Sequence, residues 1–297
     1  MIATVGRPRH VEDSLSLLCD QSLRPDLVIV SAANEADLPG AADRLFERLP
    51  FETRAVTGPK GLTRQRNRAL TMLWERDADD GFVAFFDDDF VPRLDWLENA
   101  AREFAERPSC VGLTGVLLAD GANGPGYDLR QAMQMIVQGR RLLRGGDERA
   151  RPGPARALYG CNMALRARAA RSVRFDEALP LYGWLEDEDV SGQLRQLGEL
   201  VRSERLVGVH LGTKSGRVSG ANYGYSQIAN PIYLVRKGTY PVSSAANLMA
   251  RNLAANIVKS AFPEPYVDRP SRLRGNLLAL ADLARGRLHP GGAASLR

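Results

Sequence analysis

The sequence predicts an α/β fold in which a mostly parallel sheet is flanked by helices. Short apolar segments alternate with helical patterns through the first 120 residues, which is the order of strands and helices in such a sheet. Polar residues follow directly where several of these segments end, as in Thr4–Arg7, Ser31–Asn34 and Asp87–Asp89. Because ligands bind beyond the carboxyl ends of parallel strands, we expect these three polar segments to meet at one site.

Each expected strand is a short run of apolar and β-branched residues, such as LVIV or FVAFF. Each expected helix has apolar residues at helical spacing, as Val11, Leu15 and Leu18 show in the first of them. We expect Pro92 in the first turn of the helix that follows strand 82–86, because helices tolerate proline at that position. In chain order we expect strand 2–5, helix 10–22, strand 27–30, helix 36–49, strand 51–56, helix 62–74, strand 82–86, a helix opened by Pro92, and strand 110–118.

The pattern changes after residue 120. Residues 120–127 are rich in glycine, 128–143 form an amphipathic helical pattern, and an Arg/Gly/Pro stretch runs to 157. We interpret this segment as an insertion over one end of the sheet and as a candidate loop for binding an acceptor substrate. We then expect strands 158–165 and 200–209, helix 186–197, and helices from 228 onward, with a catalytic domain over 1–220 and a helical extension over 221–297.

Composition places the chain among ordinary globular proteins, with 44% hydrophobic and 25% charged residues. The three cysteines are far apart and lack the spacing of a disulfide framework or a zinc site, which fits a reducing compartment. The first residues lack the pattern of a signal peptide, and no apolar run approaches the ~18 residues of a membrane span. We therefore expect a cytoplasmic protein, which a basic surface can also bring to the inner face of the membrane.

The net charge of +5 is unevenly distributed. Residues 269–297 contain six arginines and one acid, and residues 129–157 contain seven arginines and two acids. Acidic clusters occur at 77–89 and 176–189. This arrangement suits an anionic substrate, a metal ion or an anionic membrane, or it is simply a solvated charged surface. No nucleic-acid-binding motif is present, so we expect no nucleic-acid partner.

Asp87, Asp88 and Asp89 follow the apolar segment FVAFF without a break. Three adjacent carboxylates raise one another's pKa values unless a cation or hydrogen-bond donors compensate them. A divalent ion such as Mg²⁺ or Mn²⁺ takes carboxylate oxygens and often bridges substrate phosphates. The alternative interpretation is a solvated acidic loop.

A second acidic cluster, Glu186–Asp189, follows Trp184 and Leu185 at the start of an expected helix. Acidic residues at this position interact favourably with the helix dipole, which alone explains the cluster. The functional alternative is that one of the carboxylates acts as a general base.

The order of several motifs resembles the family 2 glycosyltransferases of the GT-A fold. Arg7 after the first strand, QRN (Gln65 to Asn67), FFDDDFVP, GCNMALR, FDE and LEDEDVSGQLRQLG occur in the order of that family, from residue 2 to about 210. The resemblance implies a metal-dependent, inverting transfer of a sugar from a nucleotide sugar to an acceptor hydroxyl. It also implies a role in bacterial surface polysaccharide or glycolipid synthesis, with a saccharide or lipid-linked acceptor.

The resemblance assigns roles to the two acidic clusters. Asp87 and Asp89 match the DxD pair, which binds the donor ribose and the metal ion at the diphosphate, and Asp88 lies between them. Asp187 matches the catalytic base, with Trp184 and Glu186 beside it as substrate-binding residues. The expected cofactor is Mn²⁺ or Mg²⁺.

Other polar residues are candidates for the donor site. Arg66 has the planar donor geometry that phosphate favours, although a salt bridge on a helix surface explains it equally well. Relatives often have an acidic residue after the second strand that contacts the base, whereas this chain has Ser31-Ala32-Ala33-Asn34. Backbone groups, Ser31 or Asn34 are then left to contact the base. The candidate donor-binding residues of the first three helices and strands are Thr4, Arg7, Ser31, Asn34, Arg66 and Asn67.

His210 follows an expected strand at a position where several proteins of this fold have a metal-binding histidine, and a buried structural histidine is the alternative. Lys214 and Arg217 lie in the segment GTKSGRVSG, which either closes over the donor diphosphate or is an ordinary surface loop.

The last 55 residues contain two amphipathic patterns, 245–262 and 272–288, with arginines and a lysine on the polar side. Such helices bind anionic membrane surfaces peripherally, or they pack on the catalytic domain or in a homodimer. Two other functions remain alternatives for the whole chain. One is a magnesium-dependent nucleotidyl or phosphoryl transferase, although no GxxxxGK[ST] loop is present. The other is a non-catalytic scaffold that binds a nucleotide sugar.

Overall fold

The computed structural model describes the chain except for residues 77–79, 123, 140–151, 216–218, 263 and 297. It contains two compact units, which we describe separately. The sheet unit comprises Met1–Lys60, Arg64–Arg174 and Gln193–Gly216. The helical unit comprises Gly61–Thr63, Phe175–Gly192 and Arg217–Arg297. The domain boundary expected at residue 220 stays a prediction.

The strands of the sheet unit are β1 (Ile2–Thr4), β2 (Leu27–Ala32), β3 (Glu52–Thr57), β4 (Phe82–Asp87), β5 (Phe90–Pro92), β6 (Cys110–Asp120), β7 (Gly153–Pro154), β8 (Asn162–Arg166) and β9 (Glu199–His210). Their order in the sheet is β3-β2-β1-β4-β8-β6-β9-β5, and β7 pairs with β9. Strands β5, β7 and β8 run antiparallel to their neighbours, and the others all run in one direction. The mostly parallel sheet expected from the sequence is therefore confirmed.

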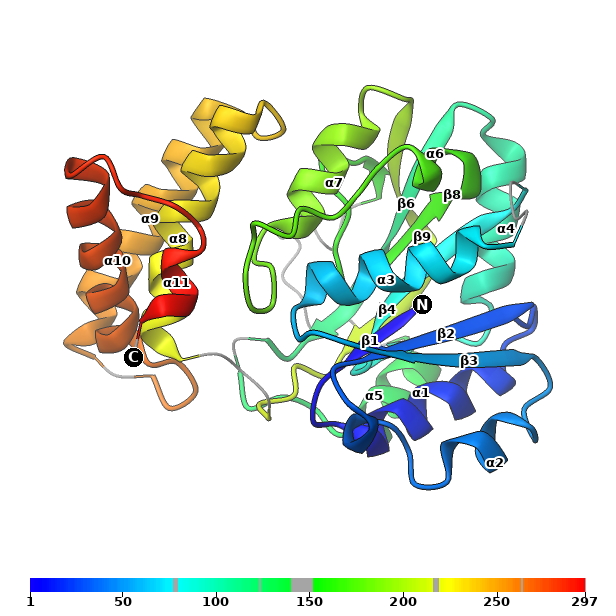
Figure 1. Ribbon diagram of the computed structural model, residues 1–297. Helices are drawn as coiled ribbons and strands as arrows, with labels where there is room; N and C mark the ends of the chain where they lie inside the picture. The colour runs from blue at the N-terminus through cyan, green and yellow to red at the C-terminus, as the bar shows by residue number, and fades with distance from the viewer. Residues whose placement is uncertain (77–79, 123, 140–151, 216–218, 263, 297) are drawn as a thin grey trace. The chain divides into compact units, whose positions relative to one another are not determined.

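The helices that cover this sheet are α1 (Pro8–Cys19), α2 (Ala42–Phe46), α3 (Leu62–Trp74), α4 (Trp96–Glu106), α5 (Leu129–Gln138) and α6 (Ala167–Arg171). Figure 1 shows α3 on one side of strands β1 to β3, with α1 and α2 on the other. The apolar stripe of α1 packs in one core with the fully buried Trp96 of α4 and with Ile2, Val30 and Phe86 of the sheet. This burial is the main force that fixes the helices on the strands.

The helix expected over 36–49 is interrupted. A short 3₁₀ helix, η1 (Glu35–Asp37), ends before Pro39 and Gly40, and α2 begins only at Ala42. Pro39 cannot continue a helix ladder, which explains the interruption. Pro92 does not open a helix either, because it ends β5 opposite Gly208 of β9, and α4 begins at Trp96. The strand β5 lies at the edge of the sheet, where proline is tolerated.

Two later elements are also shorter than expected. Helix α5 ends at Gln138 because Gly139 adopts a left-handed conformation with a φ of 61°, and residues 140–143 of the expected helix lie outside the described residues. Strand β8 begins at Asn162 rather than at 158, since Tyr159 and Asn162 face each other across a tight turn. The C-terminal helices begin at Gly220 rather than at 228, and the remaining expected elements agree with the structure to within a few residues.

The helical unit contains α7 (Glu186–Leu194, whose last two residues belong to the sheet unit), α8 (Gly220–Lys237), α9 (Val242–Ser260), α10 (Arg269–Ala284) and the short α11 (Gly292–Ser295). Helices α8 and α10 touch closely through glycines, since a Cβ on Gly224 would lie 2.0 Å from the Arg272 carbonyl oxygen. Next to this crossing, buried amide side chains of α8, α9 and α10 bond one another, with Asn256 Nδ2 donating to Gln227 Oε1 at 2.8 Å and to Asn276 Oδ1 at 2.7 Å. These contacts join the three helices into one bundle.

Within the part of the chain that the structure describes, no helix is both long enough and apolar enough to cross a membrane.

Candidate functional site

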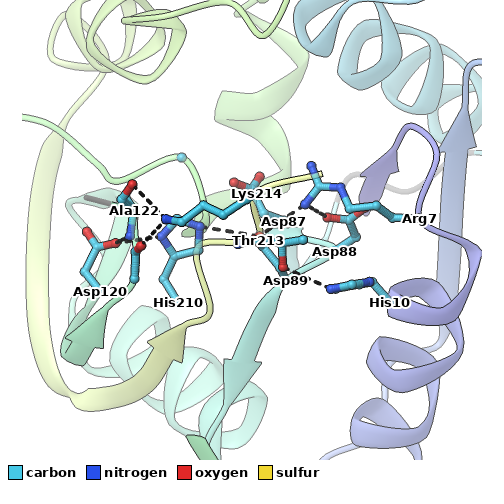
Figure 2. Close-up of polar contacts among 12 residues, drawn as sticks. Arg7, His10, Asp87, Asp88, Asp89, Asp120, Ala122, His210, Thr213 and Lys214 are labelled. Atoms are coloured by element: carbon cyan, nitrogen blue, oxygen red, sulfur yellow. Dashed lines mark hydrogen bonds and ion pairs between the residues drawn. The ribbon is translucent and has the colours of Figure 1, made fainter. Parts of the chain in front are cut away.

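The carboxyl ends of four parallel strands meet at one edge of the sheet. Ala3 of β1 pairs with Asp87 of β4, and Asp120 of β6 pairs with His210 of β9. Figure 2 shows the side chains that follow these strands, which point toward one another. The polar residues predicted to meet after β1 and β4 do so, and the cluster also includes residues from β6 and β9, which come from the second half of the sheet.

Asp87, Asp89 and His210 could hold a metal ion. One ligand atom from each of these residues lies within 4.8 Å of the other two. Asp87 is the last residue of β4, Asp89 lies in the turn before β5, and His210 ends β9. The segment that follows β9 holds this turn in place. The Asp89 carbonyl oxygen accepts from Leu211 N, and Asp89 Oδ2 accepts from Thr213 N at 2.8 Å.

His210 is oriented by a carboxylate that sequence reasoning missed. Its Nδ1 lies 2.9 Å from Asp120 Oδ1, and its Nε2 lies 3.4 Å from Asp89 Oδ1. Tyr159 hydroxyl donates to the other Asp120 oxygen at 2.9 Å, which fixes the carboxylate itself. A histidine that binds a metal commonly donates its second nitrogen to a carboxylate in this way. The ring therefore presents Nε2 to the two aspartates.

The charges around His210 and Asp89 favour a protonated histidine when no cation is bound. Burial by itself lowers the pKa of His210, but the Asp89 charge and the hydrogen bonds that the ring donates to Asp120 and Asp89 outweigh it and raise this pKa to about 10. For Asp89, burial raises the pKa, and the charge and hydrogen bond of His210 together with Arg7 lower it well below its usual range. A metal ion held here by Asp87, Asp89 and His210 would have to displace the proton from His210.

Asp88 has a different environment from its two neighbours. Its carboxylate is buried, accepts from Thr4 Oγ1 at 2.7 Å and pairs with Arg7 NH1 at 2.9 Å. Burial raises the pKa of Asp88 to about 7, with Asp89 adding to the effect and Arg7 opposing it. The structure thus places Thr4 and Arg7 at the predicted site, where they hold the turn of aspartates in place.

Arg66 is almost fully buried below the site. Its NH2 group pairs with Asp87 Oδ1 at 3.0 Å and donates to Gly160 carbonyl oxygen at 2.7 Å. The neighbouring Gln65 donates to the carbonyl oxygens of Thr4 and Ser31, both at 2.8 Å, and so ties β1 to β2. Arg66 is therefore a buried anchor of Asp87 rather than a residue of the helix surface. Asn67, the next residue, is half-buried on α3.

The loop after β2 contains a buried carboxylate that sequence reasoning also missed. Asp37 Oδ1 accepts from Gly6 N at 2.7 Å, and its Oδ2 accepts from the backbone of Ala33 and Asn34 at 3.2 and 3.1 Å. The Asn34 side chain is exposed and caps η1 by accepting from Ala36 N. Ser31 is buried, and its hydroxyl has no hydrogen-bond partner among the described residues.

Lys214 reaches across the end of β6. Its ammonium donates to Gly121 carbonyl oxygen at 2.7 Å and to Ala122 carbonyl oxygen at 3.3 Å, as Figure 2 shows. The adjacent Thr213 bonds His10 Nε2 through its hydroxyl at 3.0 Å. This loop therefore lies beside Asp89 and the end of β6, and its expected contact with a donor diphosphate stays a prediction. Arg217 of the same loop lies outside the described residues.

Trp184, Glu186 and Asp187 belong to the helical unit. Leu185, directly before α7, has a φ of 73°, a left-handed conformation that costs energy for a residue with a branched side chain. Glu186 is buried and accepts from Asp187 N, whereas Asp187 is half-buried and accepts from Glu188 N at 2.9 Å. The strained turn thus presents Asp187 at the first turn of α7.

The other acids of this cluster are bound within the helical unit. Asp189 is fully buried and accepts from Lys237 Nζ and Thr239 Oγ1, each at 2.7 Å. Lys237 also pairs with Asp176 at 2.6 Å. These carboxylates fasten α7 to the end of α8, so Asp189 and Asp176 have structural roles.

Comparison with known proteins connects this arrangement to a fold. No family model matches the chain, and no curated protein matches its sequence. Residues 1–349 of TarS from S. aureus match with a TM-score of 0.52 at 15% identity, covering 87% of this chain and 72% of that one. The same protein in complex with UDP matches with a TM-score of 0.52 at 14% identity, covering 89% and 72%.

A mannosyltransferase from Pyrobaculum calidifontis, PcManGT in complex with GDP-Man and Mn²⁺, also matches with a TM-score of 0.52 at 16% identity. The match covers 99% of this chain and 76% of that one. At such identities the likeness establishes the fold alone. That fold is GT-A, an α/β sheet flanked by helices and followed by C-terminal helices, as the sequence predicted.

Proposed function

We propose that the chain is a glycosyltransferase that transfers a sugar from a nucleotide sugar to an acceptor hydroxyl with the help of a divalent metal ion. The observation that carries this proposal is the convergence of Asp87, Asp89 and His210 at the carboxyl edge of a GT-A sheet. A structural neighbour of the same fold has GDP-Man and Mn²⁺ bound.

The three side chains fit Mn²⁺ or Mg²⁺. Two carboxylates supply the oxygen ligands that both ions prefer, and an imidazole nitrogen is compatible with Mn²⁺. Asp120 fixes the ring of His210, so the ligand geometry is set before binding. When bound, such an ion neutralises negative charge that develops on a leaving diphosphate. Two buried residues hold the aspartates in place: Arg66 pairs with Asp87, and Asp88 bonds Thr4 and Arg7.

The donor is held by the residues around this cluster. In the proposal, Lys214 and Arg217 bind the diphosphate, because a cation stabilises phosphate oxygens. The buried Ser31 hydroxyl, which has no partner within the described residues, bonds the nucleoside. In the proposal, the donor site also includes Thr4, Arg7 and Asn34. Asn67 of α3 contributes to binding the donor as well.

The proposed general base is Asp187. It takes the proton of the acceptor hydroxyl while that oxygen attacks the anomeric carbon from the face opposite the departing nucleoside diphosphate, so the product has inverted configuration. Trp184 and Glu186 bind substrate beside it. The acceptor is a saccharide or a lipid-linked saccharide in surface polysaccharide or glycolipid synthesis.

Release of nucleoside diphosphate from UDP-, GDP- and dTDP-sugars, measured with Mn²⁺ and with EDTA, tests this proposal. We expect metal-dependent release from one donor, which Asp89→Ala and Asp187→Asn abolish. Asp43→Asn is the matched control, because Asp43 is exposed on α2. Slow release without acceptor still supports the proposal, because water replaces the acceptor hydroxyl.

Two results would replace the proposal with another function. Release of a sugar 1-phosphate by cleavage of the donor's phosphoanhydride, with the sugar C–O bond intact, would indicate a nucleotidyl or phosphoryl transferase. Tight donor binding without turnover under any metal would indicate a scaffold that only binds the nucleotide sugar.

A further inference from the structure

The outer faces of α9 and α10 carry large apolar side chains that the rest of the chain leaves exposed. Phe262, just after α9, is 73% exposed, and Leu277 of α10 is 57% exposed. Ile257, Val258 and Leu278 are exposed beside them. We call these five residues the apolar ridge. Soluble proteins rarely expose a contiguous patch of this kind unless it contacts a partner or a membrane.

The two helices contribute to one continuous surface. A groove between them is lined by Ser260 at the end of α9 and by α10 residues, namely Pro270, Leu273, Arg274, Leu277 and Leu278. The opposite faces of α9 and α10 are turned inward, where Asn256 and Asn276 bond each other. The ridge therefore lies on the side of the bundle that faces away from α8.

The charges around the ridge are almost all positive. Helix α9 contains no Asp or Glu, and the single acid of α10, Asp282, accepts from Tyr225 hydroxyl at 2.9 Å. Glu264, in the connection, is paired with Lys259 and Arg269, each at 2.6 Å. Asp268 accepts from Ser271 N and so caps α10.

Two arginines remain on this surface without an acidic partner among the described residues. Arg251 of α9 and Arg274 of α10 are both exposed, and Arg274 lines the groove. Arginines insert their apolar stems along a lipid surface while the guanidinium group stays with the headgroups. A second copy of this basic surface would repel the first, whereas an anionic bilayer complements it.

We propose that the apolar ridge, with Arg251 and Arg274, docks the protein peripherally on an anionic lipid bilayer. Apolar side chains flanked by cations have the composition of helices that lie in the membrane interface. The docking needs neither the metal cluster nor Asp187, so it stands or falls independently of the proposed reaction.

Flotation of the full chain with lipid vesicles tests the docking. The vesicles contain either phosphatidylcholine alone or phosphatidylcholine with phosphatidylglycerol. We expect binding to the anionic vesicles and much weaker binding to the neutral ones. Arg251→Gln and Arg274→Gln should each lower the partition coefficient about fivefold. Ile257→Ser with Phe262→Ser should lower it at least about tenfold.

Val137→Ser is the matched control, because Val137 is 82% exposed on α5 outside the ridge, and it should bind as wild type does. Thermal melts of each variant should show that these exposed substitutions leave the fold intact. Equal binding of the ridge variant and wild type, or no binding to anionic vesicles, would overturn the proposal. A concentration-dependent dimer that the ridge variant abolishes, without vesicle binding, would assign the ridge to self-association instead and also overturn it.

Discussion

Asp120 Oδ1 lies 2.9 Å from His210 Nδ1, although the two residues are 90 positions apart in the chain. They are paired neighbours at the ends of β6 and β9. The hydrogen bond turns Nε2 of the ring toward Asp89 and Asp87. It therefore links the geometry of the sheet to the three side chains that we propose as metal ligands.

Asp120→Ala should weaken metal binding about 10- to 100-fold, because His210 loses the partner that fixes its ring. Tyr159→Phe removes only a hydrogen bond to Asp120 and should have a smaller effect. Titration of Mn²⁺ followed by electron paramagnetic resonance measures both affinities. Equal affinity of Asp120→Ala and wild type would show that the carboxylate does not orient a ligand.

Metal affinity should rise about tenfold per pH unit between pH 6.5 and 8.5, because binding displaces one proton from His210. The pKa of His210 is raised to about 10, so the ring is protonated throughout this window when no metal is bound. Isothermal titration calorimetry in buffers of different ionisation enthalpy measures the proton released. A pH-independent affinity with no proton release would exclude His210 as a ligand.

Asp88→Asn should change how stability depends on pH. The pKa of Asp88 is raised from 3.8 to about 7, so its protonated form favours folding at low pH, and this contribution is lost as pH rises through 7. Relative to Asp88→Asn, the wild type should lose about 1.4 kcal/mol of unfolding free energy per pH unit between about pH 4 and 7, and the difference should stay constant above pH 7, where Asp88 is ionised in both states. Urea unfolding at about pH 5, 6, 7 and 8 measures this difference, and parallel curves over the whole range would contradict it.

Lys237→Met should destabilise the helical unit by about 2 kcal/mol, because it leaves the fully buried Asp189 with one cation fewer. Adding Asp189→Asn to Lys237→Met should restore part of the loss, since the fully buried charge is then removed and only Asp176, which is less buried, lacks its cation. Thermal unfolding of the single and double variants measures the coupling. Arg251→Gln serves as the control and should leave the melting temperature unchanged, because Arg251 is exposed on α9. Additive effects of Lys237→Met and Asp189→Asn would contradict the pairing.

The periodicity of the sequence was sufficient to predict the parallel sheet and the convergence of its strand ends. The acidic run after FVAFF identified Asp87 and Asp89, the resemblance to family 2 glycosyltransferases pointed to His210, and the structure brings these three together. Asp120 and Asp37 were missed because their roles depend on contacts between distant segments, with His210 in one case and with Gly6 in the other.

Local signals also misplaced some elements. Pro92 is compatible with both a first helical turn and an edge strand, and only pairing with Gly208 of β9 decides between them. The interruption of the helix at 36–49 had a local signal in Pro39 and Gly40. The roles of Trp184, Glu186 and Asp187 stay predictions, because they depend on a bound substrate.

Binding of Mn²⁺ in the presence of UDP or GDP, measured by electron paramagnetic resonance, tests the central claim most directly. The wild type should bind one ion per chain with a nucleotide-enhanced affinity. Asp87→Ala, Asp89→Ala and His210→Ala should each weaken this binding strongly, whereas Asp43→Asn should not. If the three variants bind Mn²⁺ and nucleotide as tightly as the wild type, the cluster is not a metal site and the proposed mechanism is wrong.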